Sequence, residues 1–84
     1  MNWIVRWKQT ASSDLAAIWL EAANRREITA AAHRIDSQLA KDPQNAGESR
    51  EKDRRILIES PLAIIFKTKP AEKKAIVLRV WSIA

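Results

Sequence analysis

Residues 54–83 have the sequence RRILIESPLAIIFKTKPAEKKAIVLRVWSI, and this stretch decides the fold. Apolar and polar side chains alternate there with the period of strands that bury one face. The alternation divides the stretch into three predicted strands, Arg54–Glu59, Leu62–Thr68 and Ala75–Ile83. The connections are a Ser60-Pro61 turn and a short lysine-rich segment, so neighbouring strands are expected to run antiparallel. The sequence therefore predicts a three-stranded meander.

Two amphipathic helices are predicted before the meander. Apolar side chains of residues 11–23 recur at helical spacing, and Thr10 is the predicted N-cap of this first helix. A second helix is predicted to begin at Asn24, because Asn24 and Glu27 have the spacing of a capping box and an apolar stripe follows. Pro43 ends it, since the residue before a proline is disfavoured in the helical conformation. The short break between the helices predicts an antiparallel hairpin.

One further strand precedes the helices. In Asn2–Lys8, large apolar side chains alternate with polar ones, which predicts a half-buried strand. Residues 42–53 are polar, hold the only glycine, and are predicted to form a surface loop. The order is then β-αα-βββ, an α+β fold in which the helix hairpin packs on one face of a small, mainly antiparallel four-stranded sheet. Residues 1–84 are expected to form one domain, since a chain of 84 residues supports one small core.

Alternation also assigns each strand residue to one face of the sheet. The face toward the helices is predicted to hold Trp3, Val5, Trp7, Ile56, Ile58, Leu62, Ile64, Phe66, Ile76, Leu78 and Val80, with Arg54 near one end. The opposite face is predicted to hold Ile4, Arg6, Lys8, Arg55, Leu57, Glu59, Ala63, Ile65, Lys67, Val77, Arg79 and Trp81. No predicted helix remains to cover this second face. It is expected to bind a partner, or to be covered by the tail or by a second copy of the chain.

Positive charge is concentrated in the second part of the chain. The formal net charge is +5, and residues 50–84 carry nine Lys and Arg against four Asp and Glu, so the whole excess lies there. A polyanionic or acidic partner and a solubilising lysine-rich surface both explain this asymmetry. Cations beside an aromatic ring suit nucleic acid or an acidic peptide. The predicted binding residues are therefore Arg6, Lys8, Arg55, Lys67, Arg79 and Trp81.

The composition excludes several kinds of site. There is no cysteine and one histidine, His33, which rules out disulfides, thiolate nucleophiles and multi-histidine metal sites. We expect no cofactor and no metal. No apolar run approaches the about 20 residues that cross a bilayer, so we expect no membrane association and a cytoplasmic location. His33 lies off the apolar stripe of the second helix and is interpreted as a surface histidine, and Ser12 and Ser13 as first-turn helix residues.

Short motifs along nearly the whole chain resemble the RelE/ParE toxin superfamily of bacterial type II toxin-antitoxin modules, which includes plasmid stabilisation toxins. The first motifs are Trp7-x-x-Thr10-Ala11-x-x-Asp14-Leu15-x-x-Ile18-Trp19, Ile28-Thr29-x-Ala31 and Ile35-Asp36-x-x-Leu39-x-x-Asp42-Pro43. The later ones are Arg55-x-Leu57, Pro61-Leu62-x-Ile64-x-Phe66 and Val77-Leu78-Arg79-Val80-Trp81. The resemblance implies a toxin that an antitoxin protein holds inactive, with ribosome-bound mRNA or DNA gyrase as its target.

The resemblance leaves the enzymatic question open. Ribonuclease members hold the scissile phosphate with Lys and Arg side chains of the central strands, which makes Arg55, Lys67 and Arg79 the candidate catalytic residues. This chain has Ala63 where a third-strand arginine is expected. It also has only Ser82-Ile83-Ala84 where an Arg, His or Tyr is expected to follow the last strand. A ribosome-dependent endoribonuclease, a gyrase-targeting binding protein and a catalytically degenerate homologue all remain open.

Three further side chains are interpreted from their positions. Glu59 is expected to form a cross-strand ion pair rather than to act as a general base, because arginines neighbour it on the predicted face. Trp7, like the other early tryptophan on its face, is expected to anchor the core. Trp81 is expected either to contact a partner or to pack against the tail.

Overall fold

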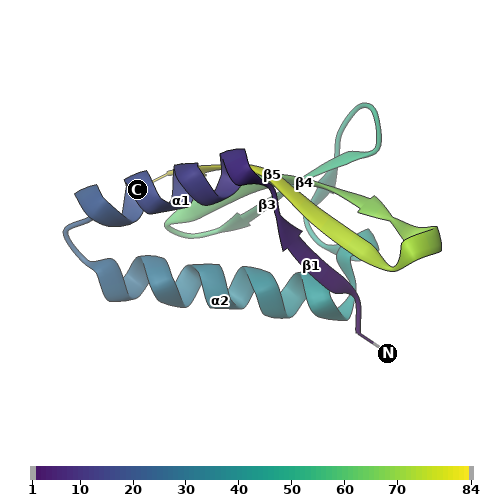
Figure 1. The fold of residues 1–84 in the computed structure, drawn as a ribbon, viewed down its shortest axis with the longest axis horizontal. Coiled ribbons are helices and arrows are strands. Elements are labelled where there is room, and N and C mark those ends of the chain that lie inside the picture. The colour runs from purple at the N-terminus through teal and green to yellow at the C-terminus, as the bar shows by residue number, and fades with distance from the viewer. Residues whose placement is uncertain (1, 84) are drawn as a thin grey trace.

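The computed structural model describes residues 2–83, and their α+β fold has the predicted order with three short additions, η1, β2 and η2. The elements are β1 (Ile4–Trp7), α1 (Gln9–Glu21), α2 (Arg25–Lys41), the 3₁₀ helix η1 (Pro43–Asn45), β2 (Glu48–Ser49), β3 (Arg54–Glu59), β4 (Leu62–Lys69), the 3₁₀ helix η2 (Pro70–Glu72) and β5 (Lys74–Ser82). Figure 1 shows α1 and α2 as two neighbouring antiparallel helices and β1 beside β5. The predicted helix hairpin is confirmed.

The sheet has one strand more than the sequence predicts. Its five strands lie in the order β1-β5-β4-β3-β2; β1 runs parallel to β5, and the other pairs are antiparallel. The additional strand, β2, is two residues long and lies inside the predicted loop. Gly47 precedes it with φ +65°, and a Cβ there would lie 2.1 Å from the carbonyl oxygen of Ile56. Only glycine allows this close approach of the loop to β3.

Strand partners share a face, so the register divides the sheet into two surfaces. The helix face packs against α1 and α2 and comprises Val5, Trp7, Ser49, Arg55, Leu57, Glu59, Leu62, Ile64, Phe66, Thr68, Ala75, Val77, Val80 and Ser82. The open face comprises Ile4, Arg6, Glu48, Arg54, Ile56, Ile58, Ala63, Ile65, Lys67, Lys69, Lys74, Ile76, Arg79 and Trp81. The core lies between the helix face and the predicted apolar stripe of α2, whose buried members are Ile28, Ala31, Ile35 and Leu39.

The predicted face assignment is wrong along the whole of β3. Leu57 is 6% exposed and belongs to the core, whereas Ile58 is 63% exposed on the open face. Three consecutive apolar residues, 56–58, fit either phase of a period-two pattern. The turn fixes the phase, because the connection between β3 and β4 is only two residues long and places Glu59 opposite Leu62. Arg55, Leu57 and Glu59 therefore lie on the helix face, and Arg54, Ile56 and Ile58 on the open face.

A second error comes from a bulge in β5. The partner of Ile65 is Arg79 and the partner of Phe66 is Val77, so Leu78 is an extra residue in β5. The bulge shifts the phase of alternation, so Val77 and Val80 both lie in the core. The predictions for Val80, Arg79 and Trp81 are confirmed, whereas those for Ile76 and Val77 are reversed. Leu78, predicted for the helix face, is 9% exposed but lies outside the core cluster.

The two predicted helix starts have different outcomes. The Asn24 side chain accepts a hydrogen bond from the Glu27 backbone N–H at 3.2 Å, which confirms the predicted start of α2. The prediction of Thr10 as an N-cap is wrong, because α1 begins at Gln9. The Thr10 hydroxyl donates instead to the carbonyl oxygen of Leu78 at 2.9 Å. Thr10 therefore attaches α1 to β5.

The Asn24 cap predicts a measurable contribution to stability. Asn24→Ala removes the acceptor and should lower the free energy of unfolding by about 1 kcal/mol, whereas Asn24→Asp, which retains a side-chain oxygen, should stay close to the wild type. Urea denaturation followed by far-UV circular dichroism measures both variants. Equal midpoints for wild type and Asn24→Ala would show that this hydrogen bond does not stabilise the start of α2.

Candidate functional site

The open face is the side of the sheet opposite the described helices, and its residues are arranged in rows across the strands. At one end, Ile58, Ala63 and Trp81 are consecutive partners on β3, β4 and β5, and Ile56, Ile65 and Arg79 form the next row. The third row is Arg54, Lys67, Ile76 and Arg6, and the fourth is Lys69, Lys74 and Ile4. Along β3 and β4, apolar side chains occupy the first two rows and basic side chains the third and fourth. On β5 and β1, Ile76 and the 47% exposed Ile4 lie within the two basic rows.

We call Ile56, Ile58, Ala63, Ile65 and Trp81 the apolar end of the open face. Ile58 is 63% exposed and Trp81 39% exposed, so two large apolar side chains meet solvent there. Ala63 lies between them and is 1% exposed. Exposed apolar groups next to a charged region are typical of a protein interaction surface.

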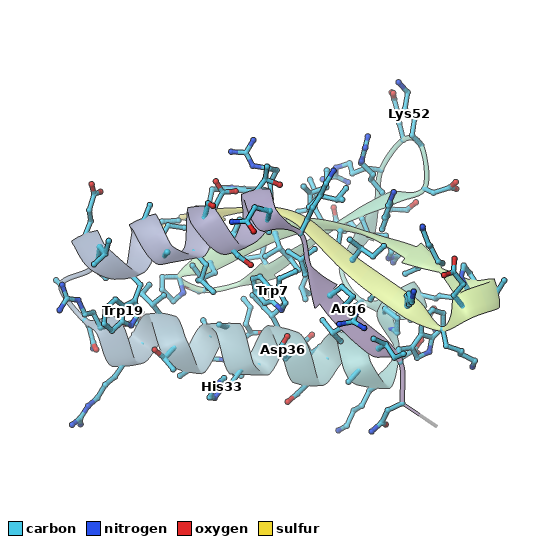
Figure 2. All side chains as sticks on the ribbon, in the orientation of Figure 1. Arg6, Trp7, Trp19, His33, Asp36 and Lys52 are labelled. Atoms are coloured by element: carbon cyan, nitrogen blue, oxygen red, sulfur yellow. The ribbon has the colours of Figure 1, made fainter. Side chains whose placement is uncertain are left out.

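We call Arg6, Arg54, Lys67, Lys69 and Lys74 the basic end. Arg54 lies directly opposite Lys67, and Lys69 directly opposite Lys74. Like charges in directly opposed positions destabilise a sheet. Within residues 2–83, Lys74 is the one member that forms a salt bridge, to Glu72 at 3.2 Å. The other four therefore present positive charge that no carboxylate of the described chain neutralises, including Arg6 on β1 (Figure 2).

The structure places the predicted binding residues in three different environments. Arg6, Lys67, Arg79 and Trp81 lie on the open face, as predicted. Lys8 is exposed beyond the end of β1, where it is the N-cap residue of α1. Arg55 was assigned to the wrong face: its guanidinium donates to the carbonyl oxygens of Ala46 at 2.7 Å and Gly47 at 3.1 Å. Arg55 thereby attaches the loop before β2 to the helix face of β3.

Sequence reasoning missed three members of the basic end. Arg54 was assigned to the helix face, and Lys69 and Lys74 were treated as parts of a turn rather than as strand residues. The two-residue turn at Ser60-Pro61 was the available signal, because it sets Glu59 opposite Leu62 and hence Arg54 opposite Lys67. The Lys69 and Lys74 pair follows from extending the same β4 and β5 ladder to its end.

The three candidate catalytic cations do not converge on one point. Lys67 points to the open face and Arg55 to the helix face. Arg79 lies on the open face, but its guanidinium is bound by the Asp14 carboxylate, with Nε to Oδ2 at 2.7 Å and the second hydrogen bond at 3.0 Å. In this register the three side chains therefore do not all lie on one face of the sheet.

Asp14 also binds the backbone of β5. Its Oδ2 accepts a hydrogen bond from the Val80 N–H at 3.0 Å. The hydrogen bond from Arg79 and the one from the Val80 amide hold the pKa of Asp14 below its ordinary value of 3.8, against the opposing effect of desolvation. The hydrogen bond to Asp14 and the negative charge of Asp14 raise the pKa of Arg79. Asp14 is therefore ionised near neutral pH and compensates much of the charge of Arg79.

Glu59 forms the ion pair that was expected, but with α2 instead of a neighbouring strand. Its carboxylate accepts hydrogen bonds from Arg34 at 2.7 Å and from Gln38 at 2.6 Å. Because Glu59 lies on the helix face, it can reach α2 and has no place on the open face. It links the end of β3 to the helix hairpin.

Apart from the open face, the structure has a groove between α1 and α2. This groove has a volume of about 730 Å³ and a mainly apolar lining that includes Leu15, Trp19, Ile28 and Ala32. Figure 2 shows Trp7 and Asp36 near one another between α1 and α2, and the indole Nε1 of Trp7 donates to Asp36 at 2.7 Å. Trp7 packs against the core cluster, as predicted. His33 is exposed at the groove's rim, consistent with a surface histidine.

The described residues offer no site for a metal and no membrane-crossing helix. No group of three or more His, Cys, Asp or Glu side chains in residues 2–83 is placed to hold a metal ion. Within the same range, neither long helix combines the length and the hydrophobicity that crossing a membrane requires.

The Asp14 contacts predict a pH dependence of stability. Because the folded state lowers the pKa of Asp14, its contribution is fully present above the unfolded value of 3.8 and is lost as pH falls through the lower folded value. Asp14→Ala should be less stable than wild type at pH 7, and the difference should shrink in the acidic range below that value. Urea denaturation at a series of pH values measures this, with exposed Glu21→Ala as the control. A constant difference across the series would contradict the assignment.

Comparison with known proteins supplies the context of this fold. No protein-family model matches the chain, and no curated protein matches it in sequence. The toxin-antitoxin complex RelBE2 from Mycobacterium tuberculosis matches with a TM-score of 0.79 and 18% identity over 98% of this chain and 92% of that one. The chromosomal ParDE toxin-antitoxin system from P. aeruginosa matches with a TM-score of 0.66 and 23% identity over 98% of this chain and 97% of that one.

A third solved structure is similar to a lesser degree. A copper-bound mutant toxin from Helicobacter pylori matches with a TM-score of 0.58 and 18% identity, over 95% of this chain and 93% of that one. All three similarities extend over nearly the full length of both chains, although fewer than one residue in four is identical. This chain therefore has the fold of the RelE/ParE toxins.

Proposed function

We propose that this chain is the toxin of a type II toxin-antitoxin module and that its open face binds an acidic antitoxin. The observation that carries the proposal is the basic end, where cations face one another across strands and, of its five members, only Lys74 forms a salt bridge within residues 2–83. The RelE/ParE fold supports it, because two of the similar structures come from toxin-antitoxin systems. The site of action is then the cytoplasm.

The electrostatics of the basic end favour carboxylates over water as its partner. Arg54 and Lys67 repel one another in the free protein, and so do Lys69 and Lys74. Carboxylates placed over the two rows would replace repulsion by charge-assisted hydrogen bonds. An acidic antitoxin therefore gains affinity from relief of a destabilising arrangement as well as from new contacts.

The apolar end supplies the second part of the binding energy. Ile58 and Trp81 are exposed in the free chain, and their burial under antitoxin side chains would remove apolar area from water at about 25 cal/mol per Å². An antitoxin segment rich in charge and poor in core residues is expected to fold only on binding, which lowers its net affinity by the cost of ordering.

For the toxic activity itself, we propose action by binding, without nuclease chemistry. The candidate catalytic cations are separated, with Arg55 on the helix face and Arg79 engaged by Asp14. Ala63, at the position where ribonuclease members are expected to carry an arginine, lies within the apolar end between Ile58 and Trp81. These features favour a protein target such as DNA gyrase over ribosome-bound mRNA.

Antitoxin binding should depend on the open face and on salt. Co-expression with an acidic protein encoded next to this chain should yield a soluble complex. Lys67→Gln and Trp81→Ala should each weaken it about tenfold, equivalent to about 1.4 kcal/mol, and only the effect of Lys67→Gln should diminish at high salt. Arg26→Gln, an equivalent charge removal in the first turn of α2, serves as the control. Fluorescence titration measures the affinities.

Equal losses for Lys67→Gln and Arg26→Gln would show that charge acts diffusely, and the open face would then not be the binding site. Absence of any complex with the neighbouring acidic protein would contradict the proposed function as a whole.

The proposed mechanism also predicts the result of an RNA assay. Expression of this chain alone should produce no ribosome-dependent cleavage of translated mRNA, because no set of three cations is assembled on one phosphate. Primer extension on a translated message, with the Lys67→Ala variant tested in parallel, measures this. Cleavage by wild type that disappears in Lys67→Ala would overturn the binding mechanism in favour of a ribonuclease.

A further inference from the structure

The rows of the open face point to the order of residues in the partner. We infer that the antitoxin segment lying on this face is divided along its length into one apolar block and one acidic block, rather than alternating between the two. This inference rests on the proposed function and specifies the chemistry of the partner at the same site. It follows from the positions of the charged and apolar rows along the strands.

The apolar end and the basic end are separated along the direction of the strands and not across it. Rows lie two residues apart along each strand, so consecutive rows are about 6.6 Å apart at a rise of about 3.3 Å per residue. The four rows together cover about 20 Å along the strands. Both rows of the apolar end lie toward the β3–β4 turn, and both rows of the basic end lie toward the β4–β5 connection. A partner that runs along β3 and β4, away from Ile76 and Ile4, meets apolar contacts first and cations second, or the reverse.

Arg79 places the boundary between the blocks. By position it is a cation in the second row, beside Ile65. Its guanidinium is nevertheless turned to Asp14, which accepts two hydrogen bonds from it at 2.7 and 3.0 Å. A partner carboxylate above the second row would have to compete with Asp14 for this guanidinium. The change from apolar to acidic partner therefore falls between the row of Ile65 and the row of Lys67.

Misplaced side chains would be costly at both ends. A carboxylate held against Ile58 and Trp81 would lose water without gaining a cation. An apolar side chain over Arg54 and Lys67 would leave their repulsion in place and desolvate them further. An alternating segment makes both errors at once, whereas a segment in two blocks makes neither.

The length of the face also limits the segment. Covering about 20 Å takes about 6 residues in an extended conformation or about 13 in a helix. A helical segment needs more residues than an extended one to cover the face. A peptide of about 13 residues is therefore long enough to cover it in either conformation.

The test uses the full chain and synthetic peptides of identical composition. Two block peptides of about 13 residues carry Leu and Ile in one half and Glu in the other, with the acidic half at either end. A control peptide alternates the same residues. Fluorescence anisotropy at low and high salt should show that the tighter of the two block peptides binds at least tenfold more strongly than the alternating peptide.

Variants of the chain assign each block to its end of the face. Lys67→Gln should weaken the block peptide at low salt and have little effect at high salt, whereas Ile58→Ser should weaken it equally at both. Leu20→Ser is the matched control for Ile58→Ser, because both side chains are 63% exposed and Leu20 lies on α1. Arg26→Gln is the control for Lys67→Gln.

Equal binding of block and alternating peptides, or no binding of either block peptide, would overturn the inference. The same salt dependence for Ile58→Ser and Lys67→Gln would overturn it as well. These results leave the co-expressed antitoxin complex untouched, so failure of the inference is distinguishable from failure of the proposed function. A clear block preference without any antitoxin complex would contradict the proposed function alone.

Discussion

The attachment of α1 to the edge of β5 determines which surface of the sheet is buried and which is free. β1 pairs with β5 only as far as Val77, and beyond that point no strand formed by residues 2–83 lies along this edge of β5. Thr10 donates to the carbonyl oxygen of Leu78, and Asp14 accepts from the N–H of Val80, so two side chains of α1 replace the missing strand. The helix hairpin is thereby fixed on one side of the sheet, and the open face stays uncovered.

The same contacts alter the charge of the open face. Arg79 is bound by Asp14 from a helix that lies beside the strand edge. One cation is thus compensated within the chain, while Arg54 and Lys67 are not. Because Asp14 compensates Arg79, the rows of the apolar end carry less free positive charge than their residue types alone would suggest. The Asp14 carboxylate therefore has two effects: it attaches α1 to β5, and it compensates the charge of Arg79 on the open face.

The sequence was sufficient to predict the long helices and strands, but it was insufficient to assign some strand residues to the correct face of the sheet. Periodicity and the capping box at Asn24 predicted the helices and the three long strands correctly, because each depends on neighbours within a few residues. The phase of β3 was misassigned although the two-residue turn before Leu62 determined it. The bulge at Leu78 had no comparable signal, because residues 75–78 are all apolar and fit either phase. The pair of Asp14 with Arg79 joins residues 65 positions apart, which periodicity cannot detect.

These errors had unequal consequences for the site. Arg6, Lys67 and Trp81 kept their predicted face, so the location of a basic surface was recovered from sequence. The sequence analysis places Arg55 on the open face and Arg54 on the helix face. With that assignment, the direct opposition of Arg54 and Lys67 could not be seen. That opposition distinguishes an unsatisfied charge cluster from a merely solvated lysine-rich surface, because a solubilising surface gains nothing from placing like charges on opposite residues. The opposed cations that an acidic partner would neutralise therefore exist only in this register, which the two-residue turn between β3 and β4 sets.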